Sequence, residues 1–467
     1  MGDLGARLAA GGTELVAEEG LRGYVVSRRW FGGRARDPLQ AHVVDCVPMP
    51  PGPRPLAIAL VEVRYPSGTH DVYQTVLGVR GEAGKVPIGG AGGEELYDAL
   101  EDGTCAPALL DALHREAVLT SPGGSTVRFT RVDGHDVDPD APARPLGADQ
   151  SNSAIVAGEG VLLKAYRRLH AGMNPELEVL RFLEEHGFRH APSLIGWWEH
   201  ANGPLEATLG VAVRFLRGAA DGFTMALDAL GTDPSAAVPR LRRLGEVTGR
   251  LHATLASDAQ DPRFAPEEPS AEMIVLAQAS LDDEIVDLFS TLVEHEHLSD
   301  LAARVEEVRS RVRLVEPAGD LGLRIRQHGD YHLGQALWHE GDWVLIDFEG
   351  EPARDIGERR RKRLPLRDVA GMLRSISYAA WVARLERGTV VSDAWEEEAR
   401  AAFLDGYLRV VEPLRILPAL RESTRRLLDL FELEKAVYEL RYELGHRPEW
   451  AAIPAAGIAA LLGREGP

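Results

Sequence analysis

The chain has 467 residues, of which 45% are hydrophobic and 27% are charged, and this balance is typical of a folded globular protein rather than of a disordered or fibrous one. The length exceeds that of one ordinary domain, so we expect two lobes or several subdomains. The formal net charge of −20 disfavours binding to nucleic acid or to an anionic membrane surface.

The cysteines and the N-terminal segment exclude further classes. Cys46 and Cys105 lie far apart without CxxC spacing, which argues against a disulfide framework and a structural zinc site and fits a reducing compartment. The first residues lack a basic region followed by a long apolar one, and no window reaches the ~18 apolar residues that a membrane span needs. We therefore predict a cytoplasmic protein with no membrane-spanning segment.

The first 135 residues carry the pattern of an α+β unit. Short β-like runs at 56–63 and 71–79 alternate with turn-forming clusters, which predicts antiparallel sheet. A glycine-rich connection at 89–93 leads into a predicted helix over 94–114, and a strand follows at 125–132. We expect residues 1–135 to form one such unit.

A stretch rich in Pro and Asp, residues 136–145, separates this unit from the next segment. The expected elements of that segment are strands at 153–156 and 161–166, a helix at 175–186, and strands at 193–200 and 208–216. We expect residues 136–217 to complete a first lobe.

From residue 218 onward amphipathic helical patterns dominate, so we predict a mostly helical second lobe over 218–467. The periodic segments are 236–256, 272–297, 298–315, 395–414 and 422–444. One island, residues 325–349, holds two short apolar runs around the turn 339–342, which predicts a β-hairpin among the helices. The fold class expected for the whole chain is α+β.

Two acidic residues bracket this hairpin. Asp347 stands seventeen residues after Asp330, and Gln335 lies between them. Phosphoryl transfer from ATP needs a carboxylate that accepts the proton of the attacking hydroxyl, and oxygen ligands for the magnesium ion that bridges the phosphates. We predict Asp330 as the catalytic base, Gln335 and Asp347 as metal ligands, and ATP and Mg2+ as the cofactors.

The histidines near the base have a different expected role. His328 is predicted to orient the loop without transferring a proton, and His332 is a candidate for substrate binding. A metal cluster of His328, Asp330 and His332 is disfavoured because zinc sites usually take a more distant third ligand. His252 falls on an amphipathic helix and is expected to be a core histidine.

A kinase also needs a cation on the phosphates, and Lys164 at the end of an apolar strand fits this role. A buried lysine is costly without a partner. Glu178 in the following helix is the preferred partner, because Glu176 points to a different helix face. We predict that the Lys164–Glu178 pair orients the phosphates of ATP.

Two further segments could contact phosphate. Ser151, Asn152 and Ser153 stand where kinases place a phosphate-covering loop, although the segment has no G-x-G-x-x-G and a plain turn is the alternative. The basic run 359–363 fits either a solvated loop face or a phosphate or partner contact.

A helix near the C-terminus carries a candidate sugar wall. Tyr438 and Tyr442 share one helix face, and Glu439 and Glu443 share another. Aromatic rings stack on sugars while carboxylates accept bonds from their hydroxyl groups, so we predict that these four residues bind substrate. The alternative is that the tyrosines pack on the core.

Motifs along nearly the whole chain are shared with one known family. They are Arg29-Trp-Phe-Gly-Gly33, Gln150-Ser-Asn-Ser153, Lys164-Ala-Tyr-Arg-Arg168 with Asn174, Pro175 and Glu178, His328-Gly-Asp-Tyr-His-Leu-Gly-Gln335, Asp347-Phe-Glu-Gly-Glu-Pro352, residues 365–375, and Glu434-Lys-Ala-Val-Tyr-Glu439. In these segments the chain resembles the bacterial maltokinase family, a branch of the aminoglycoside-phosphotransferase-like kinases.

The resemblance implies a bilobal protein-kinase-like fold with an N-terminal cap subdomain and a mostly helical C-terminal lobe. It implies ATP and Mg2+ as cosubstrates, conversion of maltose to maltose 1-phosphate, and trehalose synthase as a partner. On the matching positions, Arg214, Phe215 and Leu216 would form the adenine hinge.

One departure bears on the acceptor. Maltokinases commonly carry Gly-Trp after an acid where this chain has Asp221-Gly-Phe223. Related actinobacterial enzymes phosphorylate glucosamine, and its ammonium group would be favoured by an acidic set, namely Glu349, Glu351, Glu439 and Glu443. Maltokinase is thus the first hypothesis and glucosamine kinase the second. A catalytically silent kinase-like partner protein is disfavoured because both acids, the amide and the lysine are present.

Overall fold

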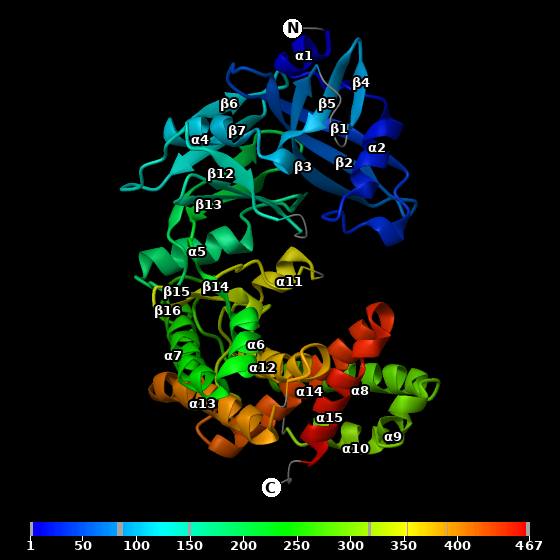
Figure 1. Cartoon of the computed structure of the whole chain (residues 1–467), viewed down its shortest axis with the longest axis vertical. Helices are drawn as coiled ribbons and strands as arrows, with labels where there is room; N and C mark the ends of the chain where they lie inside the picture. The colour runs from blue at the N-terminus through cyan, green and yellow to red at the C-terminus, as the bar shows by residue number, and fades with distance from the viewer. Residues whose placement is uncertain are drawn as a thin grey trace. The chain divides into compact units, whose positions relative to one another are not determined.

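The computed structural model describes residues 3–81, 87–147, 151–315, 319–352, 354–389 and 391–463. The chain forms two compact units (Figure 1). The first unit comprises residues 1–184 and 192–217, and the second comprises residues 185–191 and 218–467. The change of unit after Arg217 falls where the sequence pattern turns helical.

The first sheet of the first unit is antiparallel and has the strand order β1-β2-β3-β5-β4, with β11 paired to β3. Its strands are β1 (Gln40–Pro48), β2 (Leu56–Arg64), β3 (His70–Arg80), β4 (Gly89–Ala91), β5 (Glu94–Asp98) and β11 (Arg168–Leu169). The helices α1 (Asp3–Ala9) and α2 (Glu18–Ser27) bury Leu4, Leu8, Leu21 and Val25 in the core of this sheet. The predicted strands at 56–63 and 71–79 are confirmed.

The single helix predicted over 94–114 is wrong. The segment forms β5, then α3 (Ala99–Asp102) and α4 (Ala106–His114). β5 pairs with β3 in antiparallel register, with Asp98 opposite Leu77 and Glu95 opposite Arg80, and it buries Leu96. Gly103, with φ 76°, follows α3 and interrupts the helix. Pairing with a strand that is remote in sequence therefore overrode the local helical spacing.

The second sheet of this unit has the order β6-β7-β12-β13-β10-β9-β8. Its strands are β6 (Val118–Thr120), β7 (Thr126–Arg131), β8 (Ala143–Pro145), β9 (Ser153–Ala157), β10 (Val161–Ala165), β12 (Leu194–Ala201) and β13 (Ala207–Arg214). The helix α5 (Pro175–Glu185) confirms the helix predicted at 175–186. The predicted subdomain boundary at residue 135 differs from this arrangement, because β6 and β7 belong to the same sheet as the strands of 136–217.

The second unit is mostly helical, as predicted. Its longer helices are α6 (Gly222–Thr232), α7 (Ala237–Leu255), α8 (Ala271–Leu292), α10 (Val305–Val312), α12 (Leu366–Glu386), α13 (Asp393–Val411), α14 (Arg421–His446) and α15 (Ala452–Gly463), and its shorter ones are α9 (Ser299–Ala302) and α11 (Ile356–Arg360). α7 and α13 cross so closely that a Cβ atom at Gly245 or Gly406 would collide with the backbone of the other helix. Glycine at these two positions therefore permits the close packing. No helix among the described residues is long and apolar enough to cross a membrane.

The predicted hairpin is confirmed, and it gains a third strand. β15 (Ala336–His339) pairs with β16 (Asp342–Leu345), and β14 (Ala220–Asp221) pairs with β15. Glu340 and Gly341 form the turn with φ of 49° and 87°, which are the two positive values that a tight hairpin requires. The indole of Trp343 is buried and donates to the carbonyl oxygen of Arg240 at 2.7 Å, so the hairpin is anchored among the helices.

Candidate active site

The loop that carries Asp330 is fixed by a buried carboxylate at the start of α12. Asp368 Oδ2 accepts from the backbone N–H of His328 at 2.7 Å, and Oδ1 accepts from the N–H of Gly329 at 3.0 Å. His252 Nε2 lies 3.1 Å from Asp368 Oδ2, and its Nδ1 lies 3.0 Å from the hydroxyl of Tyr407. The two residues immediately before Asp330 are therefore held by one side chain.

The environment keeps Asp368 ionised. Burial by itself raises the pKa of Asp368, but the hydrogen bond and charge of His252 and the charge of His328 bring it below its ordinary value. His252 is fully buried, so the prediction of a core histidine is confirmed. No local pattern in the sequence points to Asp368, apart from its place in the family-like segment 365–375.

His328 connects the loop to the residue before Asp347. Its Nε2 lies 2.9 Å from the carbonyl oxygen of Ile346, and its ring packs against Tyr331 and Phe348 with centroid distances of 5.1 and 5.0 Å. This geometry fits the predicted orienting role. His332 instead caps the turn at Leu333–Gln335, because its Nδ1 accepts from the N–H of Gly334 at 3.1 Å.

Gln335 and Asp347 meet at the base of the hairpin. Gln335 Nε2 donates to Asp347 Oδ2 at 3.1 Å. Asp347 has φ of 65°, a left-handed conformation that costs roughly 1–2 kcal/mol for a non-glycine residue and is concentrated at functional sites. Carboxylate and amide oxygens are the ligands that Mg2+ prefers, so this donor set fits a magnesium ion.

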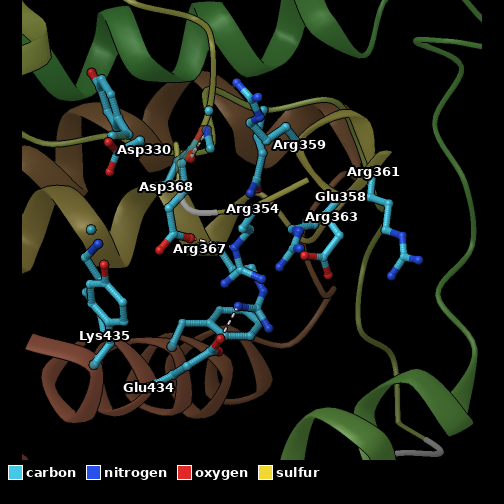
Figure 2. A pocket seen from close by; sticks show the side chains of 18 of the residues that line it. Asp330, Arg354, Glu358, Arg359, Arg361, Arg363, Arg367, Asp368, Glu434 and Lys435 are labelled. Carbon is cyan, nitrogen blue, oxygen red and sulfur yellow. Dashed lines mark hydrogen bonds and ion pairs between the residues drawn. The ribbon is translucent and has the colours of Figure 1, made fainter. Parts of the chain in front are cut away.

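A pocket of about 150 Å³ opens beside Asp330 (Figure 2). Its wall comes from the loop that carries Asp330, the segment after the hairpin, and the helices α8, α11, α12 and α14. Among the predicted substrate residues, Glu351 and Tyr438 line it together with Asp330. Burial raises the pKa of Tyr438, and the charges of Glu351 and Asp330, which line the same pocket, raise it further.

The other predicted substrate residues have partners elsewhere in the second unit. Arg374 holds Glu439 at 2.8 Å, and Glu443 is buried, accepts from the hydroxyl of Tyr378 at 2.6 Å and pairs with Arg447 at 2.8 Å. The ring of Tyr442 stacks on His446 at 4.3 Å. Glu439 and Glu443 therefore each have an arginine partner that helical spacing alone does not reveal, and their role in a sugar wall stays a prediction.

Glu349 lies on the segment that follows the hairpin, and its carboxylate is near Arg359, with 3.9 Å between Oε2 and Nη1. It does not belong to the lining of the Asp330 pocket, whereas Glu351, two residues later, does.

Lys164 has a carboxylate partner in the first unit that the sequence did not favour. Lys164 Nζ lies 2.8 Å from Glu176 Oε2, and the hydroxyl of Tyr166 donates to the same oxygen at 2.9 Å. Lys164 and Tyr166 are two residues apart in extended chain and share one face. Asn174 Oδ1 accepts from the N–H of Glu176 at 2.8 Å, which fixes this glutamate in the first turn of α5. Glu178, the predicted partner, is buried two residues farther along the helix.

The predicted phosphate-covering loop is only partly described, because residues 148–150 lie outside the described ranges. Ser151 is exposed. Asn152 Oδ1 accepts from the N–H of Arg167 at 3.2 Å, and Ser153 Oγ accepts from its Nε at 2.8 Å. Arg167 is fully buried and pairs with Asp98 of the first sheet at 2.5 Å. The side chains of Asn152 and Ser153 thus hold an arginine that the sequence analysis missed.

The predicted adenine hinge lies at the end of β13. Arg214 is its exposed last residue, Phe215 and Leu216 are half-buried, and the N–H of Phe215 donates to the carbonyl oxygen of Gly160 at 2.9 Å. The chain enters the second unit directly afterwards, at Gly218.

Comparison with known proteins assigns the family. Residues 142–423 match the phosphotransferase enzyme family, and residues 24–102 match the maltokinase N-terminal cap domain. The chain belongs to the phosphotransferase enzyme family and has its kinase-like fold with an N-terminal cap domain.

Two curated relatives are glucosamine kinases. The one from Mycolicibacterium smegmatis is 32% identical over 372 residues, which cover 76% of this chain and 88% of the relative. The one from Streptacidiphilus jiangxiensis is 29% identical over 332 residues, 68% of this chain and 73% of the relative.

Solved structures agree on the fold. A glucosamine kinase superposes with a TM-score of 0.69 at 23% identity over 98% of both chains. A glucosamine kinase in complex with glucosamine, ADP and inorganic phosphate superposes with a TM-score of 0.64 at 24% identity, over 88% of this chain and 94% of that one.

Proposed function

We propose that the protein is an ATP- and Mg2+-dependent sugar kinase whose acceptor is glucosamine. The observation that carries the proposal is the anchored loop: Asp368 fixes the backbone beside Asp330, and Asp330 opens into a pocket that also contains Glu351 and Tyr438. The two curated relatives named glucosamine kinase support the acceptor. Carboxylates also favour an ammonium-bearing sugar through charge-assisted hydrogen bonds.

In the proposed reaction, an acceptor hydroxyl attacks the γ-phosphorus of ATP while Asp330 accepts its proton, and the bond from phosphorus to the ADP oxygen breaks. Asp347 and Gln335 would hold Mg2+, which neutralises phosphate charge when bound. The Lys164 ammonium, oriented by Glu176, would contact the phosphates. His328 keeps the proton-accepting loop in register with the strand that leads to Asp347.

Maltose is the second candidate acceptor. The match of residues 24–102 to the maltokinase cap domain favours it, as does the family resemblance of the sequence motifs, which also makes trehalose synthase a candidate partner. Asp221, which precedes the Gly-Phe departure, caps α6 by accepting from the N–H of Thr224 at 2.8 Å.

The experiment is an ADP-release assay of the full chain with glucosamine, maltose, glucose and aminoglycosides, with Mg2+ and then with excess chelator. The proposal expects the highest kcat/KM with glucosamine and no turnover after chelation. Turnover of maltose without turnover of glucosamine would replace the acceptor and keep the mechanism. Failure to turn over any hydroxyl acceptor in the presence of ATP and Mg2+ would refute the kinase proposal.

A further inference from the structure

Arginines dominate one part of the wall of the Asp330 pocket. Five of them line it, namely Arg354, Arg359, Arg361, Arg363 and Arg367. In Figure 2, Asp330 and Lys435 lie on the left, and Arg361 and Arg363 lie on the right. The proposed transfer chemistry uses none of these arginines. The basic run 359–363 therefore contributes to a pocket as well as to the solvated surface.

Most cations of this region have a carboxylate. Arg354 Nε donates to Glu351 at 2.5 Å, and Arg367 Nη1 donates to Glu434 at 2.5 Å. Lys362 is buried and bonds to Glu267 and to the carbonyl oxygen of Pro262, at 2.8 and 2.7 Å. Among the residues that the structure describes, two arginines of this pocket, Arg361 and Arg363, have a guanidinium that makes no hydrogen bond or ion pair. Arg361 is exposed to solvent, whereas Arg363 is half-buried.

The position of Arg363 is built into the backbone. Its N–H donates to the carbonyl oxygen of Ile325 at 2.9 Å, and its carbonyl oxygen accepts from the N–H of Ile325 at 3.0 Å. Ile325 stands five residues before Asp330 on the same segment. The side chain of Arg363 is therefore placed relative to the catalytic loop by two hydrogen bonds rather than by a mobile surface turn.

The positive charge of Arg363 is unfavourable when no anion is bound beside it. Arg363 is half-buried, and its burial and the charges of Arg367 and Arg354 lower its pKa to about 10, against the smaller opposing effect of Glu434 and Glu358. At neutral pH the guanidinium remains charged. It has lost part of its hydration and has gained no carboxylate contact in exchange, which is the pattern of a binding position rather than of a stabilising ion pair.

We propose that Arg363, with Arg354 and Arg367 beside it, forms an oxyanion subsite of this pocket that binds a carboxylate or phosphoryl group. A guanidinium presents a planar fork of donors that matches either group. Neither a neutral hexose nor an ammonium-bearing sugar could compensate this charge. The oxyanion is either an acidic group on the acceptor, in which case an acidic sugar would be a better acceptor than glucosamine itself, or a free phosphate ion. Only the first source rests on the proposed sugar kinase activity.

The binding experiment uses the full chain without nucleotide and titrates inorganic phosphate by calorimetry and by thermal shift. Wild type should bind phosphate saturably and show a rise in Tm. Arg363→Met should weaken phosphate binding at least 10-fold, and Arg363→Lys, which keeps the charge but loses the fork, should be intermediate. Arg409→Met is the matched control, because Arg409 is an exposed arginine on α13 that pairs with Asp405.

The stability of the variant without phosphate separates a ligand site from a structural role. Arg363→Met should be at least as stable as wild type, because it removes a poorly solvated cation that repels two neighbours. A structural arginine would instead lower Tm on removal. Equal phosphate affinity in wild type and Arg363→Met overturns the subsite.

Two acceptor pairs identify the source of the oxyanion: muramic acid against glucosamine, and glucuronate against glucose. A higher kcat/KM for the acid of either pair, lost at least 10-fold in Arg363→Met, assigns the oxyanion to the acceptor. Phosphate binding without such a preference assigns it to the free ion. Absence of both overturns the proposal. If no sugar is phosphorylated, the kinase proposal fails while the phosphate titration still decides the subsite.

Discussion

Asp368→Asn tests how the catalytic loop is held. The carboxylate accepts three bonds, from the N–H groups of His328 and Gly329 and from His252. An asparagine of the same shape must direct its NH2 at one of these donors. In its better orientation it loses the bond to Gly329 and converts the other two from charged to neutral.

The magnitude follows from these contacts. One lost charge-assisted bond is worth roughly 1.5–3 kcal/mol, and weakening two others adds about 1–2 kcal/mol, so we expect the free energy of unfolding of the second unit to fall by about 2.5–5 kcal/mol. A displaced loop also moves Asp330, and an error of about 1 Å in a catalytic group costs on the order of 100-fold in kcat. ATP binding should change less than turnover.

The assays are calorimetric unfolding and steady-state ADP release at a temperature where the variant remains folded. Asp233→Asn is the control: Asp233 is exposed and accepts from the N–H and hydroxyl of Ser235 at 3.1 and 2.6 Å, so its loss should cost about 1 kcal/mol or less and leave kcat unchanged. A folded Asp368→Asn enzyme with kcat within twofold of wild type would refute the positioning role.

The pH dependence has a defined sign. Because the folded-state pKa of Asp368 is below its ordinary value, its contribution is complete above an unfolded pKa of about 4 and is lost as the pH falls through the folded pKa. Asp368→Asn should flatten the acid limb of the stability curve. An unchanged acid limb would show that other groups dominate there.

Four further predictions follow from the same structure. Asp330→Asn should lower kcat by ~100-fold or more while ADP binding, measured by calorimetry, persists; unchanged turnover would remove Asp330 from its role. Glu176→Gln should raise KM for ATP or lower kcat by about 10-fold or more, because it removes the carboxylate that lies 2.8 Å from the ammonium of Lys164, and wild-type kinetics would contradict the role of this pair. Asp347→Asn should raise the Mg2+ concentration for half-maximal rate, as measured by metal titration against wild type; an unchanged titration curve would exclude Asp347 as a ligand. Arg167→Met should destabilise the first unit by about 3–5 kcal/mol in urea unfolding, because Asp98 would keep a buried, unpaired charge; exposed Arg115→Met is its control, and equal effects of the two would contradict the argument.

Local patterns in the sequence determined much of the fold. The alternating runs of β2 and β3, the amphipathic helices α7, α8, α13 and α14, and the turn of the β15–β16 hairpin are local signals, because side-chain periodicity and turn chemistry act over a few residues. The spacing of Asp330, Gln335 and Asp347 also predicted an acid–amide–acid set, and the structure brings Gln335 and Asp347 together.

Only the tertiary structure decided which residues pair with one another. Glu176 meets Lys164, because the cap by Asn174 fixes this glutamate in the first turn of α5. Glu439 pairs with Arg374 of α12, and β5 pairs with β3. In both cases the partner lies in a segment that is remote in sequence. Asp368, which holds the backbone 39 and 40 residues before it, could be recognised only after folding had placed α12 beside the loop, because hydrogen bonds over such separations leave no periodic trace in the chain.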